Sequence, residues 1–163
     1  MIKIIQEIKT MKAIRLSSFL FLAVLFALQS CNEKTIFDQV HDFKDNTWTK
    51  ADTVSFALNV EDTITKHEFI ISLRTTKSYL YNNLWMYILV TAPDGSTSKM
   101  AQEIPLAHPD GSWTGRVSGT LVESRVRFDS KAFPIPGDYV FKFVNATQED
   151  EIPYISDIGL RIE

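Results

Sequence analysis

Cys31, the one cysteine of the chain, stands where a thiol can be joined covalently to lipid. It directly follows Leu28-Gln29-Ser30, which closes an uncharged apolar run over residues 16–28, and Lys12 and Arg15 precede that run. A short basic segment, a short apolar segment and a small residue are the parts of a secretory signal peptide. A cysteine after the small residue is typical of bacterial lipoproteins, in which diacylglycerol joins the thiol and the cut chain is acylated at its new amino end. We therefore predict lipid attachment at Cys31.

The other interpretation of the N-terminal segment is an apolar helix with an incidental cysteine. The run over residues 16–28 is shorter than the roughly 20 apolar residues that a transmembrane helix needs. A lone cysteine in an exported protein would also be an exposed reactive thiol. We therefore expect a signal peptide over residues 1–30, with Met11 as an alternative start. Membrane attachment would come from the N-terminal acyl chains, in which each buried methylene contributes about 0.8 kcal/mol.

Residue patterns typical of enzymes and metal sites are absent from the sequence. His41, His67 and His108 have no metal-ligand spacing, and there is no nucleophile elbow, glycine-rich phosphate loop or dinucleotide fingerprint. The acidic run 149–151, with Asp157 nearby, lacks the ligand spacing of a calcium loop, so a solvated acidic turn is the simpler interpretation. We predict a non-enzymatic protein without a cofactor or a metal ion.

Aromatic side chains gather around one apolar segment, residues 84–91, and offer a candidate binding surface. Tyrosine and tryptophan in a strand most often pack in the core, because each buries a large area. Sugar-binding sandwiches, however, stack pyranose rings on such side chains when they are exposed. Trp113, in a loop flanked by glycines, is the first choice for a surface that binds a partner. The candidate residues for a partner or glycan surface are Trp113, Trp85, Tyr81 and Tyr79.

Composition and charge exclude some classes of partner. Residues 31–163 are enough for one domain with a single hydrophobic core. Residues 1–30 hold four basic and one acidic residue of totals of 17 and 20, so 13 basic and 19 acidic residues remain, a net charge of about −6. A mildly acidic chain without a stripe of lysines and arginines is not expected to bind nucleic acid. A lipidated Cys31 leaves no thiol for a disulfide, so the fold depends on its packing.

Alternation of apolar and polar residues predicts an all-β fold. The pattern recurs at regular spacing with turn-forming residues between the segments, which is typical of an antiparallel β-sandwich of the Ig-like or jelly-roll-like kind, with about eight strands. The segment 84–91 is apolar on both faces and is expected at the centre of a sheet. The other expected strands are 54–60, 67–75, 98–104, 117–122, 126–128, 138–144 and 155–162.

Turns and boundaries complete this prediction. Two Pro-Asp-Gly-Ser sequences, at 93–96 and 109–112, predict turns in which glycine takes a positive φ. Tyr139 follows Pro136-Gly137-Asp138 and is expected to fix a corner through its hydroxyl, as in Ig-like domains. Only residues 147–151 suggest a helix. We expect a lipidated tether over residues 31–50 and the sandwich over residues 51–163.

Several segments, in order along nearly the whole chain after Cys31, resemble the gliding motility lipoprotein GldH family. The most specific of them is the terminal sequence ISDIGLRIE, residues 155–163. One departure is the pair Thr147-Gln148, where members of the family commonly have Met-Arg. The remaining matching segments are 79–85, 105–107, 110–115 and 133–141.

This resemblance implies a non-enzymatic accessory protein with no catalytic residues to carry over. Members of the family are outer-envelope lipoproteins associated with gliding and with the type IX secretion pathway, and they also occur in bacteria that do not glide. The implied location is the outer membrane, with the face of the membrane left open, and the implied partners are envelope motility or secretion proteins. A glycan-binding surface lipoprotein remains the alternative interpretation.

Overall fold

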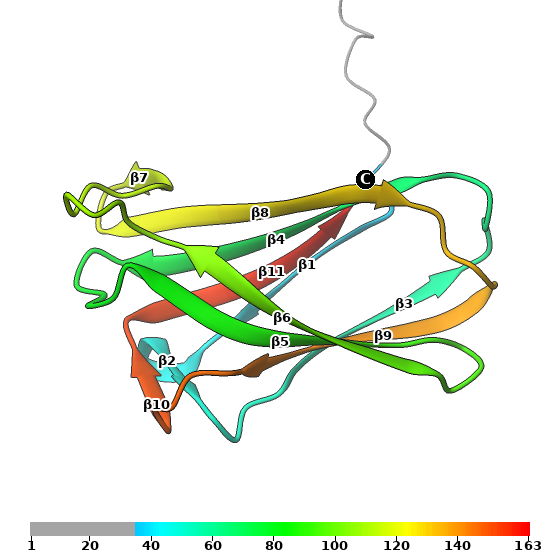
Figure 1. Ribbon diagram of the computed structural model, residues 1–163, viewed down its shortest axis with the longest axis horizontal. Coiled ribbons are helices and arrows are strands. Elements are labelled where there is room, and N and C mark those ends of the chain that lie inside the picture. The colour runs from blue at the N-terminus through cyan, green and yellow to red at the C-terminus, as the bar shows by residue number, and fades with distance from the viewer. Residues whose placement is uncertain (1–34) are drawn as a thin grey trace, which may run out of the picture. The chain divides into compact units, whose positions relative to one another are not determined.

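The computed structural model describes residues 35–163, which form two antiparallel sheets facing each other and one small two-stranded ribbon (Figure 1). The predicted signal peptide and Cys31 lie outside the described residues. The first sheet has the order β1 (Phe37–Asp42), β11 (Ile155–Ile162), β4 (His67–Thr76), β8 (Leu121–Lys131), β7 (Arg116–Ser118). The second has the order β3 (Val54–Val60), β9 (Gly137–Asn145), β5 (Asn83–Thr91), β6 (Thr97–Pro105). The ribbon joins β2 (Thr47–Thr49) to β10 (Glu151–Pro153).

Side-chain alternation along the strands forms the core between the two sheets. In β11, Ile158, Leu160 and Ile162 are buried, while Arg161 between them is partly exposed. In β9, Phe143 is completely buried, and its ring meets that of Phe56 edge to face at 5.5 Å between centroids. All the buried hydrophobic residues of the described chain lie between Phe37 and Ile162, so this unit has a hydrophobic core of its own. The predicted antiparallel β-sandwich is confirmed.

The folded unit begins earlier than the sequence suggested. Residues expected to be a tether instead form β1, a short 3-10 turn (η1, Lys44–Asn46) and β2. Trp48 is completely buried, stacks on Phe43 with 5.0 Å between ring centroids, and donates from Nε1 to the carbonyl of Asp52 at 3.0 Å. β1 is an edge strand in which only Phe37 is buried, so it has no alternating apolar pattern to detect.

The predicted turns and the tyrosine corner are confirmed. In the first turn the carboxylate of Asp94 accepts hydrogen bonds from the amide and hydroxyl of Ser96 at 2.9 and 2.6 Å, and Gly95 has a φ of 82°. The second turn repeats this geometry with Asp110, Gly111 and Ser112. The Tyr139 hydroxyl donates to the carbonyl of Ile135 at 2.9 Å.

The helix expected at residues 147–151 does not form. Thr147 instead donates its amide to the side-chain oxygen of Asn145 at 2.7 Å, which closes a local turn, and Glu151 begins β10. β10 pairs with β2, so Ile152 and Trp48, opposite each other in the register, are both buried in the core. The two expected strands at 117–122 and 126–128 are in fact the hairpin of β7 and β8, in which β8 runs on without a break to Lys131.

Candidate functional site

The aromatic residues predicted as a binding surface divide between the surface and the core. Trp85 is 42% exposed and Tyr81 is 49% exposed. Trp85 alternates in β5 with the buried residues Leu84 and Met86, so it points away from the core. Tyr79 is 7% exposed, and its hydroxyl donates to the carbonyl of Asn83 at 3.1 Å. Burial raises the pKa of the Tyr79 hydroxyl above its ordinary value.

Trp113 is half-buried in the loop between β6 and β7. It forms an isolated β-bridge with Ala107, and its side chain packs against the hydrophobic core. The adjacent amide of Thr114 donates to the carbonyl of Leu106 at 2.9 Å, and Leu106 is completely buried. Trp113 therefore holds the loop against the core and presents only part of its ring to solvent.

The outer face of the four-stranded sheet carries an aromatic pair that the sequence indicated only in part. Trp85 and Tyr87, two residues apart on β5, lie on the same outward face. The Lys99 ammonium of β6 sits over the Tyr87 ring at 3.7 Å from its centroid, a cation–π contact. The Tyr87 ring is thus partly occupied, and the exposed aromatic surface here comes mainly from Trp85.

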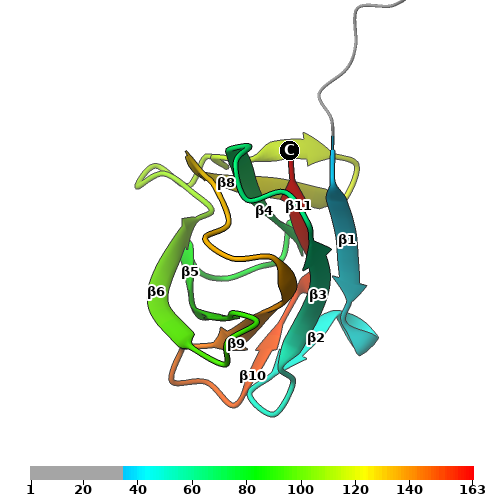
Figure 2. The same cartoon turned by 90° about the vertical axis from the view of Figure 1, so that its right-hand side faces the viewer.

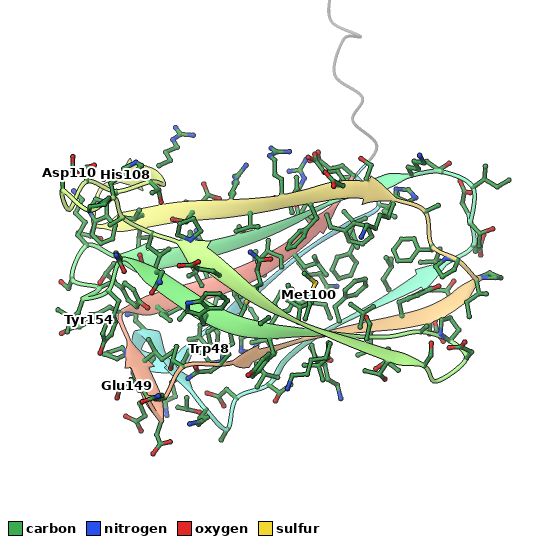
Figure 3. All side chains as sticks on the ribbon, viewed as in Figure 1. Trp48, Met100, His108, Asp110, Glu149 and Tyr154 are labelled. Carbon is green, nitrogen blue, oxygen red and sulfur yellow. The ribbon has the colours of Figure 1, made fainter. Side chains whose placement is uncertain are left out.

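On one side of the sandwich, β6 and β8 do not pair with each other (Figure 2). Side chains of both sheets there line a cleft of about 420 Å³, which we call the open cleft, and most of them are apolar. Met100 of β6 lies opposite Ile88 in the register, and both therefore point toward the interior. Ile88 is 5% exposed whereas Met100 is 45% exposed, because no strand covers it on the side of β8 (Figure 3).

Both strands that border the open cleft have a free edge. β6 pairs with β5 alone over its whole length. β8 pairs with β7 only at residues 121–123, and beyond Glu123 its second edge has no partner strand in the described chain. Free backbone donors and acceptors beside an apolar cleft suit the addition of another strand.

A second hollow lies on the outer face of the five-stranded sheet, and we call it the arginine hollow. It has a volume of about 480 Å³, and the register places its polar residues side by side across neighbouring strands. Asp157 of β11 is opposite Arg74 of β4, which is opposite Glu123 of β8, which is opposite Arg116 of β7. The charged residues that line it are Asp38, Arg74, Arg116, Glu123, Arg125, Asp157 and Arg161.

Ion pairs fix several of these arginines in place. Arg74 donates from Nε to the carboxylate of Asp157 at 2.7 Å, and this bond raises the pKa of the Arg74 guanidinium above its ordinary value. Arg125 donates to Glu123 from Nη2 at 2.8 Å and from Nε at 3.1 Å. Within the described residues Arg116 has no ion pair.

Sequence reasoning missed this grouping because its members are scattered along the chain. One signal in the sequence could have found it: charged residues recur at every second position of a strand and therefore share a face. The pairs are Arg125 with Arg127, and Asp157 with Arg161 across Gly159. The alternation predicts one face for each strand, but not which strands are neighbours. The hollow therefore appears only when the register is known.

The described residues carry no cluster of metal-ligating type. Among residues 35–163, no group of three or more histidine, cysteine or carboxylate side chains could hold a metal ion. In that same range the chain forms no helix with the length and apolarity to cross a membrane. The described residues thus form a β-sandwich that carries an apolar cleft and an arginine-lined hollow.

Comparison with known proteins identifies the family of this sandwich. The GldH lipoprotein family matches residues 35–162, and the chain belongs to this family. It is 29% identical over 157 residues to the gliding motility lipoprotein GldH of Flavobacterium johnsoniae, covering 92% of this chain and 97% of the relative. It is 26% identical over 155 residues to the gliding motility lipoprotein GldH homolog of Christiangramia forsetii, covering 90% and 94%. The chain is thus a lipoprotein of the gliding motility class, anchored by lipid to the cell envelope.

Two solved structures show only a distant likeness. The VP2 subviral particle of infectious bursal disease virus matches with a TM-score of 0.34 and 11% identity, over 78% of this chain and 33% of that one. The tailspike protein 4 of bacteriophage CBA120 matches with a TM-score of 0.30 and 9% identity, over 76% and 16%. Neither likeness carries a functional argument.

Proposed function

We propose that this protein is a non-enzymatic accessory of the gliding motility and type IX secretion machinery, attached to the outer membrane through lipid on Cys31. The observation that carries the proposal is the match to two gliding motility lipoproteins over nine-tenths or more of this chain and of each relative. The match to the Flavobacterium johnsoniae relative covers 92% of this chain, so it extends beyond the sandwich of residues 35–163. The sandwich then acts as the part that holds another envelope protein beside the membrane.

The open cleft is the surface we assign to that partner. An extended segment of the partner would pair with the free edge of β6 or β8 and insert alternate apolar side chains between the sheets. Met100 would be covered by such a segment, since it already points inward but is 45% exposed. We assign the partner to the open cleft rather than to the Trp113 loop, because the Trp113 side chain packs against the core of its own chain.

The partner surface can be tested by photo-crosslinking in cells. A photoreactive phenylalanine analogue at position 100 is expected to capture a known component of the motility or secretion machinery. The matched control carries the same analogue at Ile64, which is 89% exposed in the loop between β3 and β4 and does not line the cleft. Equal capture of the same component from both positions would count against the cleft, and capture of none from position 100 would overturn it.

The anchor is tested separately, by changing its attachment residue. The Cys31→Ala variant is expected to leave the outer-membrane fraction, and gliding and secretion should be lost with it. A Cys31→Ala variant that stays in the membrane fraction would contradict the lipid attachment. Protease treatment of intact cells that carry the unchanged protein would then show which face of the outer membrane the sandwich occupies.

A glycan-binding role is the second candidate, favoured by the exposed ring of Trp85. Exposed tryptophan on the outer face of a β-sheet can stack on a sugar ring, and Trp85 is 42% exposed there. A glycan array probed with the unchanged protein and with Trp85→Ala tests it. Binding that the substitution removes would support the role, and an array without signal would exclude it.

A further inference from the structure

All five arginines of the described chain lie on one face of one sheet. Four of them alternate with core residues in β4, β8 and β11, so their side chains point outward from the five-stranded sheet. The fifth, Arg116 of β7, is opposite Glu123 of β8, which points outward as well. The lysines of the described chain are found elsewhere, and none lines the arginine hollow. The five arginines are Arg74, Arg116, Arg125, Arg127 and Arg161.

The choice of arginine over lysine points to a particular ligand chemistry. The planar guanidinium presents five N–H donors in a fixed fork that matches the oxygens of phosphate and carboxylate groups. In Arg74 the bond to Asp157 uses Nε, and no other contact within the described residues uses its two terminal nitrogens. Arg116 has no ion pair there at all. The hollow therefore holds guanidinium donors, those of Arg74 and Arg116, that no contact within the described residues uses.

Carboxylates line the same hollow, and they define the ligand further. Asp38, Glu123 and Asp157 stand among four arginines, so the lining is close to neutral. A purely anionic ligand would meet repulsion from these carboxylates. A zwitterionic group that carries a phosphate and a primary ammonium fits both signs. Its phosphate would contact the arginines, and its ammonium would contact the carboxylate oxygen that the ion pairs with Arg125 and Arg161 leave over, Glu123 Oε2 or Asp38 Oδ1.

The uncharged residues that line the arginine hollow are small or apolar: Val40, Ile70, Ser72, Ser118 and Leu121. Ser72, which lines the hollow, is opposite Gly159 in the register, and a β-carbon on Gly159 would come within 2.7 Å of the Ser72 hydroxyl oxygen. Ile70, although it points outward, is only 3% exposed. Beside its charged residues, the hollow is thus lined by small and apolar side chains.

The chain enters the sandwich at this same hollow. The hydroxyl of Thr35 accepts a hydrogen bond from Arg161 Nη2 at 3.1 Å, and Cys31 is four residues before Thr35. Four residues span at most about 14 Å when fully extended. If Cys31 carries the lipid, as the proposed function states, its attachment point is within this distance of Thr35, and the lipid head groups around the anchor are the nearest phosphates.

From this juxtaposition we propose that the arginine hollow binds the phosphoethanolamine head group of a membrane lipid, and so holds the five-stranded sheet against the membrane in which the protein is anchored. The proposal rests on the proposed lipid anchor at Cys31. A tether this short keeps head groups at a high effective concentration, so a weak intrinsic affinity is enough to keep the sandwich in one orientation.

The test measures head-group binding by a protein without the lipid anchor, so its result does not depend on whether Cys31 is lipidated. Residues 32–163, which contain the complete core, are titrated with the short-chain lipid dihexanoyl-phosphatidylethanolamine below its micelle concentration. The arginine Nε–H signals are followed by NMR. Saturable shifts are expected for Arg116 and Arg74, and dihexanoyl-phosphatidylcholine should bind more weakly, because its quaternary ammonium cannot donate hydrogen bonds to the carboxylates.

Two variants and one further ligand make the result decisive. Arg116→Ala, at an exposed position, should weaken binding about tenfold or more, since a charge-assisted contact is worth at least about 1.4 kcal/mol. Arg127→Ala is the matched control, because Arg127 lies on the same face but outside the hollow, where it pairs with Glu68 at 2.7 Å. Equal weakening by both variants, no shifts at all, or the same shifts with inorganic phosphate alone would each overturn the lipid assignment.

Discussion

Arg74 and Asp157 form an ion pair between neighbouring strands in which only one partner is buried. The Asp157 side chain is 4% exposed, whereas that of Arg74 is 43% exposed, and their atoms Oδ1 and Nε are 2.7 Å apart. Removing Arg74 and removing Asp157 should therefore differ in their effect on stability. Without Arg74 a buried carboxylate has lost its cation, but without Asp157 the guanidinium can turn toward water.

We expect Arg74→Met to destabilise the fold more than Asp157→Asn. The cost of Arg74→Met should be about 2 kcal/mol, below the roughly 3–5 kcal/mol of a fully buried pair, because solvent already screens the exposed arginine. Asp157→Asn should cost about 1 kcal/mol. Urea unfolding of both variants and of the double variant measures the difference, and a larger loss in Asp157→Asn would contradict it.

The loop between β3 and β4 contains an aspartate whose pKa depends on its neighbours. The Asp62 carboxylate accepts hydrogen bonds from the hydroxyl of Thr65 at 2.5 Å and from the amides of Ile64 and Thr65 at 2.7 and 3.1 Å. These bonds favour the charged form and lower the pKa of Asp62 from 3.8 to about 2. A lowered pKa in the folded state means that the stabilisation is complete above pH 3.8 and is lost as the pH falls toward 2.

The expected test is an NMR titration of the Asp62 carboxyl group. Thr65→Ala removes the hydrogen bond that contributes most to the shift, so the pKa of Asp62 should rise toward 3.8. Asp94 is the internal control, because its pKa is lowered by Ser96 and should not change in the variant. A pKa of Asp62 that stays near 2 in Thr65→Ala would show that the backbone amides alone set it.

Trp48 and Trp85 offer a matched pair for testing where the folded unit begins. Trp48 is completely buried in the part of the chain that precedes β3, whereas Trp85 is 42% exposed on β5. Trp48→Ala should destabilise the protein by about 3–5 kcal/mol, and Trp85→Ala by less than about 1 kcal/mol. Thermal unfolding measures both, and a similar small loss in the two variants would place residues 35–49 outside the cooperative unit.

The sequence predicted the strands well where apolar residues alternate and poorly where they do not. β3, β4, β5, β6, β9 and β11 were expected close to their observed bounds. β3 and β9 bury alternate residues, β5 is apolar on both faces, and β6 follows the turn at residues 93–96, although only Ile104 of β6 is buried. β1 has a single buried residue, and Trp48 and Phe43 are buried through packing with distant segments, so alternation could not reveal them. Tyr139 was predicted because a local motif determines its hydrogen bond to Ile135.

Surfaces were harder to predict than strands, since they depend on which strands become neighbours. Tyr79 and Trp85 belong to one aromatic cluster in the sequence, but one is buried and the other exposed. The open cleft exists because β6, which ends its sheet, does not pair with β8, whose second edge has no partner strand in the described chain beyond its pairing with β7. No local pattern in either strand contains that information.

Two glycines lie close to neighbouring strands, but the obstacles beside them differ in kind. A β-carbon on Gly115 would overlap the backbone carbonyl of Glu123, which cannot move without disturbing β8. A β-carbon on Gly159 would first meet the Ser72 hydroxyl at 2.7 Å, and this small group can rotate away. Gly115→Ala should therefore cost about 3 kcal/mol, at the upper end for overpacking, and Gly159→Ala about 1 kcal/mol.

Second substitutions distinguish the two cases. Ser72→Ala should recover part of the stability lost in Gly159→Ala, although Val40 Cγ2 would still lie at 3.2 Å from the new methyl group. Ser124→Ala should not recover the stability lost in Gly115→Ala, because the Glu123 carbonyl remains in place. This holds even though the Ser124 hydroxyl oxygen is also only 2.6 Å from the position of a β-carbon on Gly115. Urea unfolding measures both double variants. Recovery of stability in both would contradict the prediction, because it would mean that the backbone of β8 shifts to accommodate the new methyl group at position 115.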